Sequence, residues 1–371
     1  MKLRAVIAAA IFLSLLSGCA ERPKPKPIFH AQENPTLLKD WGVLNVEDGQ
    51  LNLGQGVMPY SLNTALFTDY AHKLRTIWIK EGGANYNDKE VLDFPVGTII
   101  SKTFYYPLTL TGEVKKTAER QHVTQKQGLK IAHHKLIETR LLVRREIGWE
   151  PLSYVWTEDQ SEARLTRIGA LVPLKIRDAS QVTDFSYLVP NVNQCAGCHA
   201  PNNTTRELKP IGPKARHLNG VYHYADGAMN QLNKLTDMGY LSKTSQSLPQ
   251  AAIWDDKAFS LNERARAYLD INCAHCHNPV GPADTSGLHL NPENESQPHL
   301  GVCKTAVAAG SGTGGRKYDI TPGEPENSSL HYRMETRDPR AMMPELGRSL
   351  VDAEGVMLIA EWISAMDSRC E

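Results

Sequence analysis

The chain has 371 residues and carries 41 basic and 41 acidic side chains, so it is formally neutral. This length leaves room for two or three domains and a sizeable buried core. The balanced charge excludes the basic surface of a nucleic-acid-binding protein, and the composition fits a soluble globular fold.

The N-terminus predicts export. Lys2 and Arg4 precede an apolar run over residues 5–16, which is too short to span a bilayer and has the form of a signal peptide. Residues 16–19 (Leu-Ser-Gly-Cys) look like a bacterial lipobox, in which Cys19 is diacylated and becomes the first residue of the mature protein. The alternative is an ordinary signal peptide with a chance cysteine.

These features predict a lipoprotein signal peptide at 1–18 and a lipidated, Pro/Lys-rich tether at 19–40. The protein would then be anchored in a membrane through the lipid on Cys19 and would face the periplasm. Ala20, rather than aspartate, follows the lipid-bearing cysteine, and this favours the outer membrane.

Residues 41–190 are predicted to form a β-rich domain. Strand-type residues with partial alternation stand at 75–79, 98–105, 136–143 and 152–156. No long amphipathic helix is visible among them. A small sandwich or barrel would satisfy this pattern.

The pattern changes in the second half of the chain. Residues 191–257 are loop-rich, contain a first Cys-x-x-Cys-His motif and predict a short helix at 229–238. Residues 258–371 contain a second such motif and predict a mainly α-helical domain. Its first helix is expected at 261–272 and its last at 352–366.

Both motifs have a defined chemical use. In Cys-x-x-Cys-His the two thiols add to the vinyl groups of a haem as thioethers, and the histidine becomes an axial ligand of the iron. Composition alone predicts roughly 0.005 such motifs in this chain, whereas two are present, behind the export signal that haem attachment needs. We therefore expect two covalently bound haem c groups. The thioether cysteines would be Cys195, Cys198, Cys273 and Cys276, and the proximal iron ligands would be His199 and His277.

Two rival uses of the cysteines remain open. A four-cysteine zinc site would combine both pairs, but the gap between them is far longer than the usual spacing of about 15–20 residues, and zinc gives no reason for the two histidines. A redox-active disulfide would need a thioredoxin-like βαβ setting, which the pattern does not predict.

The sixth ligand of each iron is a separate question. For the second haem the best candidate is Met343, in a loop before the last helix that Pro344 would stiffen. The alternatives are Met342, Met334 or a packing role for Met343. For the first haem no residue stands out, and an open sixth position is a further alternative. The side chains considered for it are Met229, Met238, His217, His223, His72, His122, His133 and His134.

Each proximal histidine is expected to donate its second ring N–H to a backbone carbonyl. The proline-containing loop at 210–213 could present such a carbonyl to His199. The loop at 279–282 could do the same for His277.

Cys303 and Cys370 are the cysteines left over. Because an exported protein meets an oxidising compartment, they predict a disulfide, which the chain-entropy model values at about 4 kcal/mol. Two free thiols are the alternative.

A resemblance to known proteins adds to these predictions. Residues 260–371 resemble class I cytochrome c domains, with a helix leading into the second motif, a methionine loop and a closing helix. The phrases at 62–70, 94–98 and 154–156 are similar to a family of exported dihaem c-type cytochrome lipoproteins of unassigned role. Pattern and resemblance together predict a multidomain fold, with an N-terminal β-rich domain followed by a mainly α-helical, cytochrome c-like haem-binding region.

The leading interpretation is a dihaem c-type cytochrome of the bacterial cell envelope, which takes electrons from one redox protein and passes them to another. This makes it an electron-transfer protein rather than an enzyme, and no catalytic residue is assigned. One alternative is a dihaem peroxidase-like oxidoreductase with one open catalytic haem. Another is that the β-domain is a binding module that recruits a dehydrogenase or a glycan.

Overall fold

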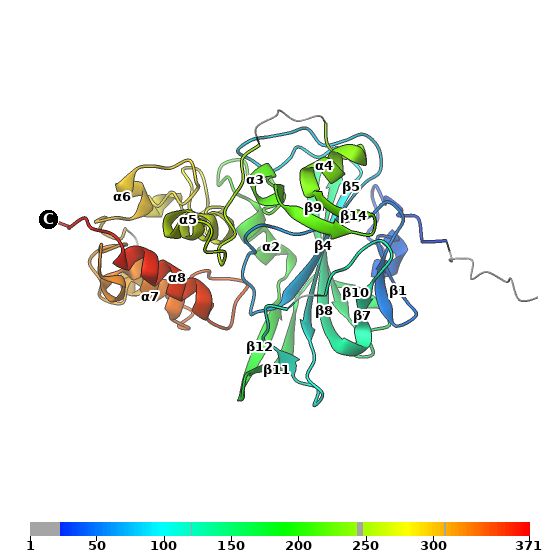
Figure 1. Cartoon of the computed structure of the whole chain (residues 1–371), viewed down its shortest axis with the longest axis horizontal. Coiled ribbons are helices and arrows are strands. Elements are labelled where there is room, and N and C mark those ends of the chain that lie inside the picture. The colour runs from blue at the N-terminus through cyan, green and yellow to red at the C-terminus, as the bar shows by residue number, and fades with distance from the viewer. Residues whose placement is uncertain (1–22, 120, 243–247, 308) are drawn as a thin grey trace, which may run out of the picture.

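The computed structural model describes residues 23–119, 121–242, 248–307 and 309–371. The expected signal peptide and Cys19 lie outside the described residues. Figure 1 shows the strands gathered in one part of the molecule and the helices that follow residue 260 gathered at the other end, with the C-terminus among them.

A six-stranded antiparallel sheet is the largest element of the fold. Its strand order is β10-β9-β8-β5-β4-β3, and runs of β-branched and aromatic residues favour these strands. The strands expected at 75–79, 98–105, 136–143 and 152–156 all lie within this sheet, so those predictions are confirmed. The six strands are β3 (Met58–Tyr60), β4 (His72–Ile79), β5 (Thr98–Pro107), β8 (His134–Arg145), β9 (Gly148–Trp156) and β10 (Ala163–Thr166).

Three smaller sheets surround this one in the described residues. Strands β1 (Leu44–Glu47), β2 (Gln50–Leu53) and β7 (Leu129–Lys130) form the first of these sheets. Strands β6 (Val114–Lys115), β11 (Ala170–Asp178) and β12 (Gln181–Val189) form the second. Strands β13 (Val221–Tyr224) and β14 (Gly227–Asn230) form the third.

Apolar clusters hold the sheet in place. One cluster contains the fully buried Trp41, whose Nε1–H donates to the hydroxyl of Tyr154 at 2.7 Å. A second cluster joins Ile77 and Ile100 of the sheet to Leu218 and Leu235, which come from helices that follow the first motif. These helices are α3 (Ala215–Leu218) and α4 (Gln231–Asp237). The short helix expected at 229–238 therefore exists as α4, preceded by a strand.

Residues 23–40 of the expected tether are described and lie against the fold. The backbone N–H of Gln55 donates to the carbonyl of Pro25 at 2.8 Å, and that of Ile28 donates to the carbonyl of Trp41 at 2.9 Å. Phe29 packs against the cluster that contains Trp41. The 3₁₀ helix η1 (Leu38–Trp41) completes this segment.

The second half of the chain begins with α2 (Val192–His199), and its longest helices are α5 (Leu261–Asn272) and α8 (Ala353–Ser364). The Ser260 hydroxyl accepts from the N–H of Glu263 while the Glu263 carboxylate accepts from Ser260, which is the capping box that fixes the start of α5. The remaining helices among the described residues of this half are α6 (Gln297–Leu300) and α7 (Ser329–Glu335), with the 3₁₀ turns η3 (Asp284–Ser286), η4 (Gly310–Thr313) and η5 (Pro325–Asn327). A further 3₁₀ turn, η2 (Ile131–His133), lies earlier in the chain, between β7 and β8.

The expectation of a mainly α-helical, cytochrome c-like region is wrong. The described part of the chain is predominantly β-rich, with four sheets, and its helices are short. Between α5 and α7 the chain is mostly turns and loops. The physical reason is composition, since this stretch is rich in glycine, proline and asparagine, which favour turns over helix.

Cys303 and Cys370 form the expected disulfide, with their Cα atoms 5.2 Å apart. It ties the C-terminal residues that follow α8 to the loop after α6. None of the helices within the described ranges combines the length and the apolar character needed to cross a bilayer.

Candidate functional site

The two Cys-x-x-Cys-His motifs lie side by side. Cys276 and Gly197 are 79 residues apart in sequence, yet the Cys276 thiol lies 3.8 Å from the carbonyl oxygen of Gly197. The Cys276 thiol also hydrogen-bonds to Cys198, and this bond lowers the pKa of Cys198 well below its usual value. The second cysteines of the two motifs are therefore in contact.

Local structure places each motif. Asn191 and Gln194 form a capping box at the start of α2, with hydrogen bonds of 2.9 and 3.0 Å, and α2 carries the first motif to its last residue, His199. The second motif begins at the residue that caps α5. Both motifs thus stand at the end of a helix whose start is fixed by a capping box.

Both motif histidines have one ring nitrogen already bonded. Nδ1 of His199 donates to the carbonyl of Lys209 at 2.8 Å. Lys209 directly precedes Pro210, in the loop that was expected to present this carbonyl. Nδ1 of His277 lies 3.1 Å from the hydroxyl of Ser286 instead, so the expected carbonyl from loop 279–282 is wrong for this histidine. The Ser286 hydroxyl donates in turn to the carbonyl of Ala283 at 2.6 Å, which leaves its oxygen free to accept from His277.

The second ring nitrogens are free to act as ligands. Burial lowers the pKa of His199 and of His277 to about 4, so both imidazoles are neutral near pH 7. Among residues 23–119, 121–242, 248–307 and 309–371, no group hydrogen-bonds to Nε2 of either histidine. A neutral imidazole with Nδ1 donating and Nε2 free is the form that binds a metal.

The second motif lines a cavity of about 360 Å³. His277, Met334 and Met343 all line it, whereas Met342 does not. The backbone N–H of Met343 donates to the carbonyl of Arg333 at 2.7 Å, which holds the methionine loop against α7. Of the methionines considered for this site, the structure therefore brings two to the cavity of His277.

The first motif lines a smaller cavity of about 130 Å³, and the six-stranded sheet forms one of its walls. None of the methionines or histidines considered for the first haem lines this cavity in the described residues. His217, for example, is buried elsewhere and donates to Asp270 at 2.8 Å. Met229 and Met238 pack against the cluster that contains Leu235.

Basic side chains from the sheet line the first cavity instead. Arg75, Lys102 and Arg140 stand directly opposite one another on β4, β5 and β8, and all three reach this cavity. Arg140 is paired with the buried carboxylate of Glu138, at 2.9 Å from Nε to Oε2. Like charges placed opposite each other across strands destabilise a sheet. The ion pair between Arg140 and Glu138 offsets part of this repulsion.

Lys102 stands in the middle of this row. Burial lowers its pKa to about 7, and the positive charges of Arg140 and Arg75 contribute to this lowering. Its ammonium group lies 5.1 Å from the centre of the Phe104 ring, and it forms no ion pair with any described residue. Sequence analysis missed this residue, although a lysine within an apolar strand is a signal that could have found it.

The two cavities share part of their lining. Cys198 belongs to both, as does His275, whose Nδ1 is buried without a hydrogen-bond partner. A group bound in one cavity would therefore lie next to a group bound in the other. The other shared residues are Phe67, Asn272, Pro344 and Leu346.

A buried ion cluster links α3, which follows the first motif, to α5, which precedes the second. Asp270 on α5 accepts from Arg216 on α3 at 2.7 and 2.9 Å and from His217 at 2.8 Å. Burial by itself would raise the pKa of Asp270, but the hydrogen bonds from His217 and Arg216 hold it well below its usual value. Asp270 is only three residues before Cys273, so this cluster fixes the end of α5 on which the second motif depends.

The rival uses of the cysteines find no support in the geometry. Cys195, Cys198, Cys273 and Cys276 are all free thiols rather than disulfides. Within the part of the chain that the structure describes, these cysteines do not form a group of three ligands within 4.8 Å of one another, as a shared zinc site would need.

Searches for similar proteins give no further guide. No protein-family model, no curated protein and no solved structure matches the chain. Its function is therefore inferred from its own residues and their geometry.

Proposed function

We propose that the chain is an exported dihaem c-type cytochrome that transfers electrons in the bacterial cell envelope. The observation that carries the proposal is the convergence of two Cys-x-x-Cys-His motifs, each with its histidine in its own cavity and with one ring nitrogen already hydrogen-bonded. A shared zinc site would need at least three of these ligands to meet, which they do not do in the described residues, and all four cysteines are free thiols rather than disulfides.

The donor set fits haem at both places. Cys195 and Cys198 would form the thioethers of the first haem, with His199 as its axial ligand. In the second motif, the corresponding cysteines stand beside His277 at the end of α5. When bound, haem supplies an iron that accepts and releases one electron. The protein's part is to hold it, exclude water and set its potential.

Met343 is the sixth ligand that we propose for the second haem. It lines the cavity of His277, and its backbone is fixed by the hydrogen bond to Arg333. A thioether ligand favours ferrous iron and raises the reduction potential. Met334 lines the same cavity and is the alternative at this position.

The basic row on the sheet would serve the first haem. Haem carries two propionates, and Arg75, Lys102 and Arg140 offer positive charge in a cavity whose buried acid, Glu138, is already paired with Arg140. An anion in this cavity would be attracted by the positive charge of this row.

Electrons would pass between the haems through the shared wall. Cys198 and Cys276, which would each hold one of the haems, are in contact, and the two cavities share part of their lining. Two haems held by these residues would supply the chemistry needed to take electrons from one redox partner and give them to another. The lipid on Cys19 would keep the protein at the membrane.

A second candidate function is suggested by the first cavity. The methionines and histidines considered for the first haem do not line it, and basic side chains stand there. A haem with an open sixth position beside positive charge could bind and reduce a small oxidised substrate, as in a dihaem peroxidase. The proposal of electron transfer requires that this position be closed to such ligands.

Pyridine haemochrome quantitation tests the proposal. Protein matured in a host that attaches haem should contain two haems per chain, and addition of carbon monoxide to the reduced protein should leave the spectrum unchanged. One carbon monoxide-binding haem would favour the peroxidase-like alternative. Protein without covalent haem would contradict both.

A further inference from the structure

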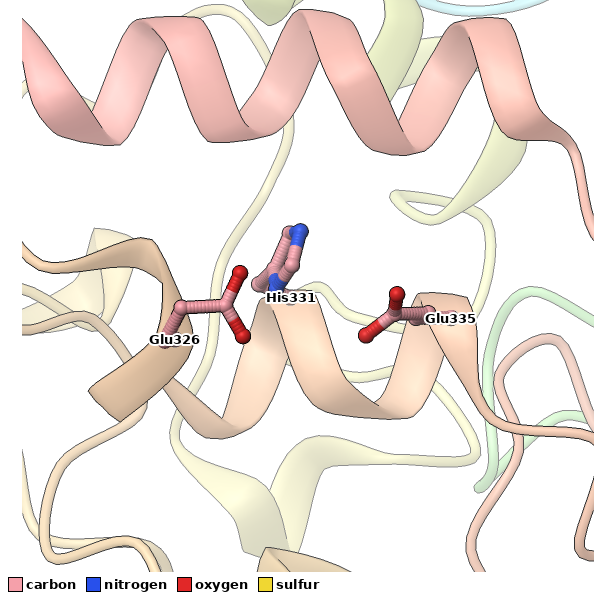
Figure 2. Close-up of side chains that lie close together, drawn as sticks. All are labelled: Glu326, His331 and Glu335. Atoms are coloured by element: carbon pink, nitrogen blue, oxygen red, sulfur yellow. The ribbon is translucent and has the colours of Figure 1, made fainter.

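Three possible metal ligands form a group that has no role so far. They lie at the face of α7 that points away from the cavity of the second motif. Glu326 in η5 and His331 and Glu335 on α7 bring one possible ligand atom each to within 4.8 Å of one another. In Figure 2 the ring of His331 stands between the two carboxylates, which approach it from either side. His331 and Glu335 are four residues apart and so share one face of the helix.

His331 points to a missing partner. Only 4% of its surface is exposed, and its Nδ1 is buried without a hydrogen bond. A buried polar atom that makes no hydrogen bond costs roughly 1–3 kcal/mol, so such atoms normally have a partner. No donor or acceptor for this ring is found in the described residues.

The two carboxylates add unbalanced charge beside that ring. Glu326 and Glu335 are exposed, and neither carboxylate forms an ion pair or a hydrogen bond with another described residue. The nearby Arg316 donates to the backbone carbonyl of Glu326, and its guanidinium lies over the ring of Tyr332. The place between the three side chains therefore combines two negative charges with an imidazole nitrogen that lacks a partner.

We propose that Glu326, His331 and Glu335 bind one divalent metal ion of borderline character, such as Zn²⁺. Two carboxylate oxygens and one imidazole nitrogen are a donor set that zinc accepts, with water in the fourth position. Both glutamates are exposed and can turn toward the ion at little cost, while the buried histidine is already in place. This site is separate from the four motif cysteines.

The position of the site connects it to the second cavity. Leu330, Arg333 and Met334 on the other face of α7 line that cavity. The carbonyl of Arg333 also accepts from the backbone N–H of Met343. A metal ion that joins η5 to α7 would therefore brace the helix against which the methionine loop is held.

Zinc binding to the full mature chain tests the proposal. Haem-loaded protein is treated with a chelator, dialysed against buffered Zn²⁺ and analysed for zinc and iron. We expect one zinc per chain. Loss of a residue that only hydrogen-bonds to a metal ligand weakens metal binding about tenfold or more, so loss of a ligand itself should weaken zinc binding at least about tenfold. Glu335→Gln and Glu326→Gln should both show this loss.

Control variants separate this site from others. Glu361→Gln changes an exposed acid on α8 and should leave zinc binding unchanged. His299→Ala removes one ring of the stacked pair His289–His299, whose centroids are 4.2 Å apart and which could also hold zinc. It should likewise leave binding unchanged.

The two glutamate variants carry the decision, because both side chains are exposed and their replacement leaves the core intact. Wild-type affinity in both variants would overturn the proposal. So would binding that disappears only in His299→Ala, or the absence of any bound zinc. Because zinc and haem are measured separately, the metal site can fail while the cytochrome proposal stands.

Discussion

The two motif regions share the same short sequence pattern but have different surroundings. The first motif ends a helix that packs on β9 of the large sheet, and three basic side chains of that sheet reach its cavity. The second motif follows α5, and the wall of its cavity contains two methionines and the loop after α7. The motif specifies where haem would be attached, while residues distant in sequence specify what kind of haem site results.

This difference predicts two unlike haems. A methionine ligand would favour a high potential at the second site. At the first site, positive charge and the absence of the expected methionines or histidines from the described lining favour a different ligand state. Substitutions in either region should therefore change the spectrum or the reduction potential of one haem and leave those of the other unchanged.

Removal of one pair of cysteines should have the largest effect. Cys195→Ser/Cys198→Ser should lose the first haem and Cys273→Ser/Cys276→Ser the second, because each pair supplies both thioethers of one haem. Pyridine haemochrome absorbance should fall by half in each variant, and the two residual spectra should differ. Ala196→Ser, which keeps the first motif intact, should retain both haems. Equal residual spectra would contradict the comparison.

Asp270→Asn should destabilise both regions together. It removes the carboxylate that accepts from Arg216 and His217 and leaves a buried cation without its partner, at a cost of about 3–5 kcal/mol. The free energy of unfolding, measured in denaturant, checks this. Asp226→Asn breaks an exposed pair with Lys234 and should change stability little.

The pH dependence of this effect has a defined sign. The pKa of Asp270 in the folded protein lies well below the value of about 3.9 expected when the chain is unfolded. Its contribution is therefore fully present above pH 4 and is lost only as the pH falls below that value. The difference between wild type and Asp270→Asn should widen as the pH falls from 8 to 5, because burial already lowers the pKa of His217 and loss of its Asp270 partner lowers it further. A difference that shrinks as the pH falls through this range would assign the effect to another group.

Met343→Ala should change the second haem alone. Loss of the thioether should remove the sulfur-to-iron charge-transfer band and lower the potential of that haem by on the order of 0.1 V. Met334→Ala is the matched control, because Met334 lines the same cavity, and it should keep the band. If the band survives in Met343→Ala and disappears in Met334→Ala, the ligand is Met334.

Lys102→Met should give the smallest effect, confined to the first haem. Below pH 7 Lys102 is charged, and removal of that charge disfavours ferrous iron. The reduction potential of the first haem should then fall by the equivalent of a free energy on the order of 1 kcal/mol. Redox titration that resolves the two haems checks this. Lys175→Met, which removes an exposed lysine of β11, should leave both potentials unchanged.

Features encoded locally were predictable from the sequence. The four long strands, the helix that starts at Ser260 and the pairing of Cys303 with Cys370 were all expected and are present. Each depends on a short pattern or on the number of cysteines. The loop whose Lys209 carbonyl accepts the hydrogen bond from His199 was also expected, because Pro210 and Pro213 mark it.

Features that depend on distant contacts were not predictable. The contact between Cys198 and Cys276 and the row from Arg75 to Arg140 arise from pairing across the sheet and from packing on it, which no local pattern reports. The mainly helical region was expected because two helices flank it, but turn-forming residues fill the chain between them. The hydrogen bond between His277 and Ser286 was also not predictable, because it depends on how the loop after the second motif folds back toward the ring.

The intact mass of the mature protein, expressed in a host that attaches haem, tests the covalent attachment most directly. We predict a mass that exceeds that of the lipidated polypeptide by two haems, and that loses one haem in each cysteine-pair variant. A mass equal to that of the polypeptide without haem would contradict the assignment of His199 and His277 as iron ligands.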